Sequence, residues 1–201
     1  MYDLVIIGGG GLAKVIIDAA LKCGHNVLGY LDDNPEVSEV LGYNRLGYVS
    51  DCVNYADKAQ FIIAIGNDKI RKEIFEKYDL TYATIIHPNA VIGTNTVIGK
   101  GTVVMAGVII NADTTIGSHS VINTSAVVEH DCTIGDFTMV APHSTVCGFT
   151  KIGSNCWLGA GATVNNTVSI CDGVIIGSGG VVVENINLKG TYVGVPVRKI
   201  K

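Results

Sequence analysis

Residues 109–140 read IINADTTIGSHSVINTSAVVEHDCTIGDFTMV, and an aliphatic residue returns in them at every sixth position. The same period continues without a slip from Ile86 to Asn187, which gives seventeen consecutive six-residue units, or hexads. The first residue of every hexad is aliphatic: Ile86, Ile92, Ile98, Val104, Ile110, Ile116, Ile122, Val128, Ile134, Val140, Val146, Ile152, Leu158, Val164, Ile170, Ile176 and Val182. A helix repeats at about 3.6 residues and an ordinary strand at about 2, so neither explains this period. A parallel β-helix does, because each hexad then supplies one short strand and one turn.

The remaining hexad positions have the character that the corners of a β-helix require. The fifth position holds only small or β-branched residues, and the second position is often glycine. Glycine tolerates the positive φ angle of a tight corner, and a small side chain fits where the coil narrows. With three flat sides per coil, residues eighteen apart are expected to stack about 4.8 Å apart along the axis. A β-sandwich would not need a fixed six-residue phase and is the weaker alternative.

Composition excludes several classes of protein. The chain has 201 residues, 48% of them hydrophobic, a net charge of -4 and no block of basic residues, which argues against a nucleic-acid partner. The apolar runs are too short to span a membrane and the first residues do not resemble a signal peptide, so we expect a cytoplasmic protein. The six cysteines form no CxxC pair, and Cys132 and Cys156 fall at fifth positions, so we interpret them as small buried residues in a reducing compartment.

The N-terminal part has the pattern of a nucleotide-binding half-fold. A buried strand (DLVII, residues 3–7) precedes a glycine-rich turn, an amphipathic helix (LAKVIIDAALKCG) and a second strand (NVLGYL) that ends in two aspartates. In this layout phosphates bind over the N-terminus of the helix, and the ribose lies near the acidic residues after the second strand. The candidate nucleotide-binding residues of this segment are Gly8, Gly9, Gly10, Gly11, Asp32 and Asp33.

The spacing Gly8-x-Gly10-x-x-Ala13 also matches the dinucleotide fingerprint. However, only about half of a dinucleotide domain precedes the hexads, so a mononucleotide is the better match. A tight turn that binds nothing is the structural alternative.

Further candidates follow the third predicted strand (FIIAIG, 61–66). Gly66 and Asn67 would lie at the carboxyl edge of the sheet, and Asn67 is suited to cap the helix DKIRKEIFEKY. Arg71 would either reach a phosphate or lie solvated on that helix. Between the second and third strands the pattern predicts a strand or loop at 46–49 and a helical turn at 53–56, and a last strand, TYATIIH, leads into the hexads.

The sequence therefore predicts three parts: a Rossmann-like α/β domain over 1–85, a parallel β-helix over 86–187, and a C-terminal segment over 188–201 that caps the last coil.

A histidine between carboxylates interrupts the otherwise smooth coil. Glu129 is the only acidic residue at a second position, and His130 and Asp131 follow it. A histidine titrates near neutral pH and a neighbouring carboxylate can hold its tautomer, so His130 is a candidate general base. Gly148, eighteen residues further on, should stack beside the imidazole and leave room for a reacting carbonyl, with an N–H for an oxyanion. An exposed corner histidine without a role is the alternative.

A metal enzyme similar to γ-carbonic anhydrase would need histidines paired on one edge of the coil. His119, His130 and His143 are separated by eleven and thirteen residues and so fall on three different sides, and we therefore expect no metal.

Six segments, IIGGGGLAKVIID, GYLDDNP, IAIGNDKIRKEI, INTSAVVEHDCTIGDF, CGFTKIGSNCWLGAGATV and YVGVPVRK, are together similar to the sialic acid O-acetyltransferase (NeuD/PglD) family of left-handed β-helix acetyltransferases. The resemblance covers essentially the whole chain. It implies a left-handed coil, a homotrimer with active sites between neighbouring subunits, acetyl-CoA as co-substrate, and a nucleotide-linked amino sugar bound by the N-terminal domain.

The resemblance also assigns roles to residues that match the family's motifs. The glycines at 8–11 would hold the diphosphate, Asp32 and Asp33 the uracil or ribose, and Asn123 would touch the sugar. His130 would be the base, assisted by Asp131 or Glu129, with Gly148 facing the thioester. Acetyl-CoA would be bound by Met139, Gly148 and a tunnel lined by Gly159, Ala160, Ser178, Gly194 and Pro196, with Arg198 or Lys199 near its phosphates.

Two positions depart from the family pattern. Some relatives carry histidine where Leu12 and Met139 stand here, which leaves one nucleotide contact and any second catalytic histidine open.

The sequence leaves three possible functions open. The favoured one is an acetyl-CoA-dependent N-acetyltransferase that uses His130 as base to acetylate a UDP-linked 4-amino sugar for cell-surface glycan biosynthesis. An O-acetyltransferase of sialic acid or another sugar hydroxyl would use the same base. A non-enzymatic β-helix scaffold is the third.

Overall fold

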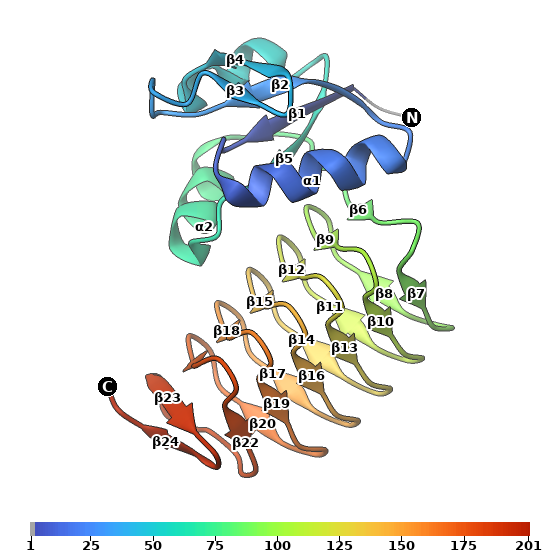
Figure 1. The fold of residues 1–201 in the computed structure, drawn as a ribbon, viewed down its shortest axis with the longest axis vertical. Coiled ribbons are helices and arrows are strands. Elements are labelled where there is room, and N and C mark those ends of the chain that lie inside the picture. The colour runs from blue at the N-terminus through green and yellow to red at the C-terminus, as the bar shows by residue number, and fades with distance from the viewer. Residues whose placement is uncertain (1–2) are drawn as a thin grey trace. The chain divides into compact units, whose positions relative to one another are not determined.

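The computed structural model describes residues 3–201 and contains two compact units. One unit ends at Pro88, and the other runs from Asn89 to Lys201. The first is a sheet with helices, and the second is a stack of short coils (Figure 1). The junction lies inside the first hexad of the sequence, so the two units follow each other without a linker of their own.

The first unit contains a sheet in the strand order β3-β4-β2-β1-β5. Its strands are β1 (Asp3–Ile7), β2 (Asn26–Leu31), β3 (Glu39–Val40), β4 (Tyr43–Gly47) and β5 (Gln60–Ile63). β1 pairs in parallel with both β2 and β5, β2 pairs in parallel with β4, and β3 and β4 form an antiparallel hairpin. The strand order therefore reverses at β1, and open α/β sheets bind ligands beyond the carboxyl ends of the strands at such a point.

The helix α1 (Gly11–Lys22) connects β1 to β2, and the helix α2 (Asp68–Lys77) follows β5. α1 buries Ile16 and Ile17 on one face, which is the period predicted from the sequence. The side chain of Asn67 accepts hydrogen bonds from the backbone N–H groups of Lys69 and Ile70, so the predicted cap of α2 is confirmed.

Two predictions for the first unit need correction. The helical turn predicted at 53–56 falls on the end of a longer 3-10 helix, η1 (Val49–Tyr55), and on its C-cap Ala56. The segment TYATIIH is not one strand, because Tyr82 makes only an isolated bridge to Phe61 and a separate short strand, β6, covers Ile85–Ile86. A residue with high strand propensity forms a strand only where a neighbouring strand can pair with several successive residues, and here only one residue of the segment, Tyr82, pairs with β5.

The second unit is the predicted β-helix, with one two-residue strand per hexad. The strands are β7 (Val91–Ile92), β8 (Val97–Ile98), β9 (Val103–Val104), β10 (Ile109–Ile110), β11 (Thr115–Ile116), β12 (Val121–Ile122), β13 (Val127–Val128), β14 (Thr133–Ile134), β15 (Met139–Val140), β16 (Thr145–Val146), β17 (Lys151–Ile152), β18 (Trp157–Leu158), β19 (Thr163–Val164), β20 (Ser169–Ile170), β21 (Ile175–Ile176) and β22 (Val181–Val182). Val127 pairs with Ile109 on one side and Thr145 on the other, so the eighteen-residue stacking is confirmed. The coil is left-handed.

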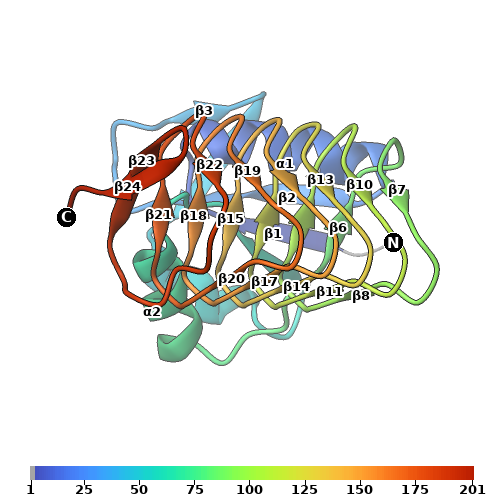
Figure 2. The same ribbon diagram turned by 90° about the horizontal axis from the view of Figure 1, so that it is seen from below.

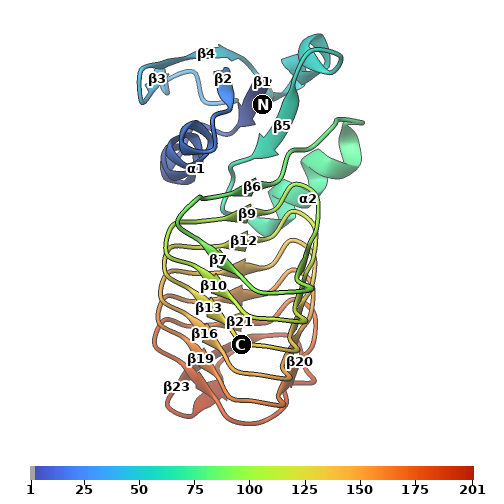
Figure 3. The ribbon, with the colours of Figure 1, turned by 90° about the vertical axis from the view of Figure 1, so that its right-hand side faces the viewer.

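The coils build three flat faces (Figures 2 and 3). We name the sheet from β7 through β13 to β22 the first face, the sheet from β8 through β14 to β20 the second face, and the sheet from β9 through β12 to β21 the third face. The chain runs from the third face to the first and then to the second, so each hexad turns one edge. An edge is named below by the two faces that it joins.

The interior of the coil is aliphatic. The leading residues from Ile110 to Val182 are all buried, whereas Ile92 in the first coil is exposed because only one coil stacks on it. Fifth-position hydroxyl groups add hydrogen bonds to this core, since Thr138 and Ser144 each donate to a backbone carbonyl fifteen residues ahead, those of Gly153 and Gly159. The small fifth residue thus also satisfies a corner carbonyl that would otherwise be buried without a partner.

The last coil is extended by β23 (Thr191–Gly194), which pairs in parallel with β21, and by β24 (Val197–Lys199), which pairs antiparallel with β23. Thr191 N–H also donates to the carbonyl of Lys201. These strands cover part of the open end of the coil, which a solenoid requires.

Candidate active site

His130 lies on the first–second edge of the coil, in the corner between β13 and β14. The backbone fixes this corner, because Glu129 N–H donates to Val146 O and Asp131 N–H donates to Ala112 O. Asp131 has a φ angle of 57°, in the left-handed region that a tight corner imposes on its second residue. The imidazole therefore stands on a rigid edge that hydrogen bonds hold from both neighbouring coils.

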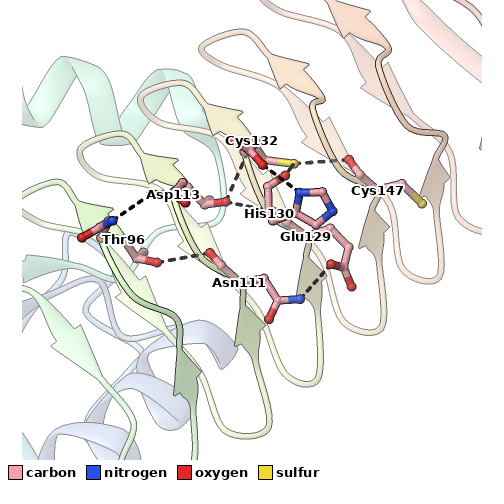
Figure 4. Close-up of polar contacts among 10 residues, drawn as sticks. Thr96, Asn111, Asp113, Glu129, His130, Cys132 and Cys147 are labelled. Carbon is pink, nitrogen blue, oxygen red and sulfur yellow. Dashed lines mark hydrogen bonds and ion pairs between the residues drawn. The ribbon is translucent and has the colours of Figure 1, made fainter.

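The imidazole contacts Asp131 and lies against Gly148, two of the three partners that the sequence suggested. Its Nδ1 lies 2.8 Å from Oδ2 of Asp131 (Figure 4). Because a carboxylate only accepts hydrogen bonds, this contact places the proton on Nδ1 and leaves the lone pair of Nε2 free. On the next coil the ring faces Gly148, where an added Cβ would lie 3.0 Å from Nε2 and 2.9 Å from Cε1. The nitrogen suited to accept a proton thus lies directly over a residue without a side chain.

Glu129 turns away from the imidazole. Its Oε2 accepts a hydrogen bond of 2.8 Å from Nδ2 of Asn111, one coil earlier (Figure 4). The sequence left open whether Asp131 or Glu129 supports the histidine, and the geometry favours Asp131.

Phe149 was not among the predicted site residues, although its ring meets the imidazole edge-on. The two ring centroids are 5.1 Å apart with an interplanar angle of 89°, and the phenyl ring is 56% exposed. Phe149 follows Asp131 by eighteen residues, so the stacking rule applied to every residue of the motif would have found it. The same rule finds Asn111 from Glu129.

Two buried donors hold the peptides of this edge from inside the coil. Oγ1 of Thr114 donates to Glu129 O at 2.8 Å, and Sγ of Cys132 donates to Cys147 O at 3.2 Å (Figure 4). In a trans peptide the N–H points away from the C=O, so the inward carbonyl of Cys147 turns the N–H of Gly148 outward. No hydrogen bond within residues 3–201 occupies that N–H.

The buried thiols of Cys132 and Cys156 are not nucleophiles in this structure. Burial raises the pKa of Cys132, and it raises the pKa of Cys156 to about 11. Because the thiolate is the reactive form, both side chains remain inert thiols near neutral pH.

The glycine-rich turn of the first unit is tightly constrained at its start and open at its end. Gly8 has a φ angle of 105° and donates its N–H to Leu31 O, and a Cβ there would lie 2.7 Å from Cγ1 of Ile65. Added Cβ atoms at Gly10 and Gly11 would meet no atom within 4 Å. The backbone at the N-terminus of α1 therefore has open space beside it, and phosphate binding there stays a prediction.

A cavity of about 400 Å³ lies beside this turn, at the carboxyl ends of the strands. Its lining combines acidic, hydroxyl and apolar residues: Gly8, Asp32, Asp33, Val49, Ser50, Ile65, Ile70, Glu73, Ile74, Lys77 and Tyr78. Asp32 and Asp33 were predicted, whereas Glu73 and Lys77 were not. Their spacing of four residues on α2 was the only sequence signal that they share one helix face.

The two aspartates also stabilise the loop around the cavity. Asp32 accepts from Gly9 N–H through Oδ2 at 2.6 Å and from Asn34 N–H through Oδ1 at 2.8 Å. Asp33 accepts from Val49 N–H through Oδ1 at 2.8 Å. Both oxygens of Asp32 are thus already hydrogen-bonded to backbone, and Asp33 retains one oxygen for a ligand.

The sequence predicted that Arg71 would either reach a phosphate or lie solvated on α2. In the structure its side chain is buried and directed inward. Its side chain is 1% exposed, and Nη1 donates to Ile65 O at 2.7 Å and to Gly66 O at 2.8 Å. Desolvation lowers the pKa of Arg71 to about 10, while the nearby Asp68 acts in the opposite direction. The guanidinium therefore shapes the loop at Gly66 and Asn67 from beneath and does not reach a phosphate.

Apart from Gly148, the residues predicted for the acetyl-CoA tunnel lie away from the first–second edge. Ala160 and Ser178 are exposed corner residues of the third–first edge, eighteen residues apart and so on successive coils. Gly161 and Gly179 beside them leave open space where a Cβ would be. This edge is smooth enough for an extended ligand, but β16 and β19 of the first face separate it from Gly148.

Other predicted residues lie on the third–first edge or close to it in the coil. Asn123 lies on it, and its Nδ2 is 4.0 Å from the sulfur of Met139, which is buried on the third face. Gly159 is buried below Ala160. The β23–β24 hairpin carries the remaining four as exposed residues, Gly194 and Pro196 at its turn and Arg198 and Lys199 on β24. Within one chain, therefore, Gly148 is the tunnel residue that lies at His130, and the structure does not bring Asn123 or the other predicted tunnel residues to it.

The other histidines of the coil stand apart from this site. His119 is buried and stacks on Phe137 with ring centroids 5.2 Å apart, and His143 lies on the third–first edge. Residues 3–201 contain no group of three or more His, Cys, Asp or Glu side chains placed to hold a metal ion. The same residues form no helix that is long and apolar enough to cross a membrane.

Comparisons with known proteins match both units. Residues 3–78 match the family model of the PglD N-terminal domain, and residues 113–148 and 149–184 match the bacterial transferase hexapeptide (six repeats). UDP-N-acetylbacillosamine N-acetyltransferase of Bacillus subtilis (strain 168) is 35% identical over 113 residues, which are 53% of this chain and 52% of that protein. The chain thus matches about half the length of this curated relative.

Two solved structures match nearly the whole chain. The acetyltransferase domain of PglB from Neisseria gonorrhoeae FA1090 is 30% identical with a TM-score of 0.94, and the match covers 98% of this chain and 99% of that one. A point variant of perosamine N-acetyltransferase from Caulobacter crescentus, in complex with CoA and GDP-perosamine, is 36% identical with a TM-score of 0.95, and the match covers 99% and 97%.

Proposed function

Because the chain belongs to the PglD/NeuD-like family of left-handed β-helix sugar acetyltransferases, we propose that it transfers the acetyl group of acetyl-CoA to the amino group of a nucleotide-linked amino sugar. The relatives named above support the reaction class. The observation that carries the proposal is local: Nδ1 of His130 lies 2.8 Å from Asp131, and the opposite side of the ring lies against Gly148.

The residues of the first–second edge account for the proton transfer. An amino group that attacks a thioester must lose a proton, and Nε2 of His130 is placed to accept it. Asp131 holds the ring in this tautomer and stabilises the imidazolium that results. The outward N–H of Gly148 is directed so that it can stabilise the negative charge that develops on the acetyl oxygen. Acetyl-CoA, when bound, would supply the activated acetyl group. His130 could return its proton to the sulfur as the C–S bond breaks, so that CoA leaves as the thiol.

The division of the predicted residues between two edges supports assembly of the site from more than one subunit. The base lies on the first–second edge, and the smooth surface for an extended ligand lies on the third–first edge of the same chain. If the first–second edge of one subunit faces the third–first edge of another, both sets meet in one groove. We therefore propose a homotrimer with its active sites between subunits, and this arrangement agrees with what the family resemblance implies.

The first unit would bind the nucleotide of the acceptor substrate. The diphosphate would lie over the open glycines at the N-terminus of α1, and the base would occupy the cavity at the carboxyl ends of β1 and β5. The activated sugar would then belong to a pathway of glycan biosynthesis.

A thiol-release assay tests the proposal. The protein is incubated with acetyl-CoA and either nucleotide-linked amino sugars or free sialic acid, and free CoA is measured over time. We expect turnover only with the amino sugars, and a loss of about 10²–10⁴-fold in kcat for His130→Ala. Acetyl-CoA binding, measured by calorimetry, should be retained in that variant, and His25→Ala serves as a control histidine in the first unit. Turnover with sialic acid alone would assign the protein to O-acetylation instead, and full activity of His130→Ala would remove the proposed base.

A further inference from the structure

The cavity of the first unit is lined by apolar side chains together with a few polar ones, as a site for a nucleotide base requires. Apolar side chains, including Val49, Ile65, Ile74 and Tyr78, form much of its lining of about 400 Å³. Such walls hold a planar group by its two faces. The base of a nucleotide is the part of the proposed substrate that fits this description, so the polar residues of the lining decide which base is bound.

Three of the six carboxylate oxygens in the lining already accept backbone hydrogen bonds. Asp32 accepts two backbone hydrogen bonds and Asp33 accepts one. Glu73 differs from them, since residues 3–201 contain no hydrogen bond or ion pair to its carboxylate. Lys77, one turn further along α2, lies over the ring of Tyr78 at 5.1 Å instead of pairing with it. Glu73 thus offers both carboxylate oxygens to a ligand in the cavity.

The bases differ in what they present to a carboxylate. Guanine carries two adjacent donors, N1–H and the exocyclic N2 amino group, which match the two oxygens of one carboxylate. Uracil carries a single N3–H donor between two carbonyl oxygens, which a carboxylate repels. Adenine and cytosine each place an acceptor nitrogen beside their amino group. Guanine is therefore the base that can use both oxygens of Glu73.

We propose that Glu73 makes this cavity selective for guanine, so that the acceptor is a GDP-linked amino sugar and not the UDP-linked one suggested by the family resemblance. This inference rests on the proposed function, since it names the nucleotide of the same site. The structure of the Caulobacter crescentus relative, which holds GDP-perosamine, agrees with it.

Calorimetric titration of the full chain with GDP, IDP and UDP tests this assignment without requiring turnover. IDP lacks only the N2 amino group and so removes one of the two predicted hydrogen bonds. We expect GDP to bind at least about tenfold more tightly than IDP or UDP, because hydrogen bonds to a charged group are among the stronger ones. Glu73→Gln, which replaces one acceptor oxygen with a donor, should reduce the preference for GDP over IDP to within about threefold. Glu76→Gln is the matched control, because Glu76 pairs with Lys72 and lies outside the cavity lining.

The possible outcomes distinguish failure of the guanine assignment from failure of the nucleotide site. Equal or tighter binding of UDP to the unmodified protein would overturn the guanine assignment while leaving a nucleotide site intact. An unchanged GDP preference in folded Glu73→Gln, verified by its melting temperature, would overturn the role of Glu73. Binding of none of the three nucleotides would overturn both the assignment and the nucleotide site of the proposed function.

Discussion

Replacing Gly148 with alanine tests whether the position of the imidazole limits the reaction. The new Cβ would lie 2.9 Å from Cε1, 3.0 Å from Nε2 and 3.5 Å from Cδ2 of His130, and the first two distances are shorter than van der Waals contact. The backbone at Gly148 does not require a positive φ angle, so alanine is compatible with the corner itself. The side chain that must yield is the half-exposed imidazole.

The size of the effect follows from that displacement. The ring must move by about 0.5 Å to relieve the contact, and misplacing a reacting group by about 1 Å can cost roughly 10²-fold in rate. We therefore expect kcat to fall by about 10-fold to 10²-fold. The melting temperature should change little, because the displaced ring moves toward solvent and not into the core.

Steady-state thiol release measures kcat, and circular dichroism measures the melting temperature of the same sample. Thr94→Ala is the control, since Thr94 holds the equivalent corner position on an earlier coil, away from the imidazole. If Gly148→Ala acts through the ring, adding it to His130→Ala should cause little further loss. Wild-type kcat in a folded Gly148→Ala variant would refute this reasoning.

Three further predictions concern residues that support the two sites. Asp131→Asn should lower kcat by about 10²-fold or more, because the amide no longer fixes the tautomer of the neighbouring histidine; unchanged kcat across the pH profile would contradict this. Arg71→Ala should reduce the free energy of unfolding by roughly 2–3 kcal/mol in urea titrations, since two backbone carbonyls lose a charged donor, whereas the exposed Lys72→Ala should change it by less than about 0.5 kcal/mol. Cys132 and Cys156 should resist iodoacetamide near pH 7 in the folded protein and react on unfolding, because burial raises both pKa values and shifts thiolate formation to higher pH; rapid labelling of the native chain, measured by mass spectrometry, would show that these thiols are accessible.

The two units differ in how much of their chemistry the sequence reveals. In the coil, a site residue and its neighbours on adjacent strands are related by a fixed offset, so Gly148 could be placed beside His130 by counting. In the α/β unit no such offset exists. The glycine-rich turn and the aspartates were visible as a motif, but Glu73 joins the same cavity only because α2 packs next to the strand ends.

The sequence by itself determined the coil, its eighteen-residue register and the location of His130 and Gly148 on one edge. It did so because hexad periodicity is a local property: each strand pairs with the hexad three places away, and no distant contact alters the count. Only the tertiary structure decided that Asp131 and not Glu129 contacts the imidazole, and that Arg71 points inward. Those outcomes depend on rotamers and on which polar atoms the packed neighbours leave free, and a sequence pattern does not specify either.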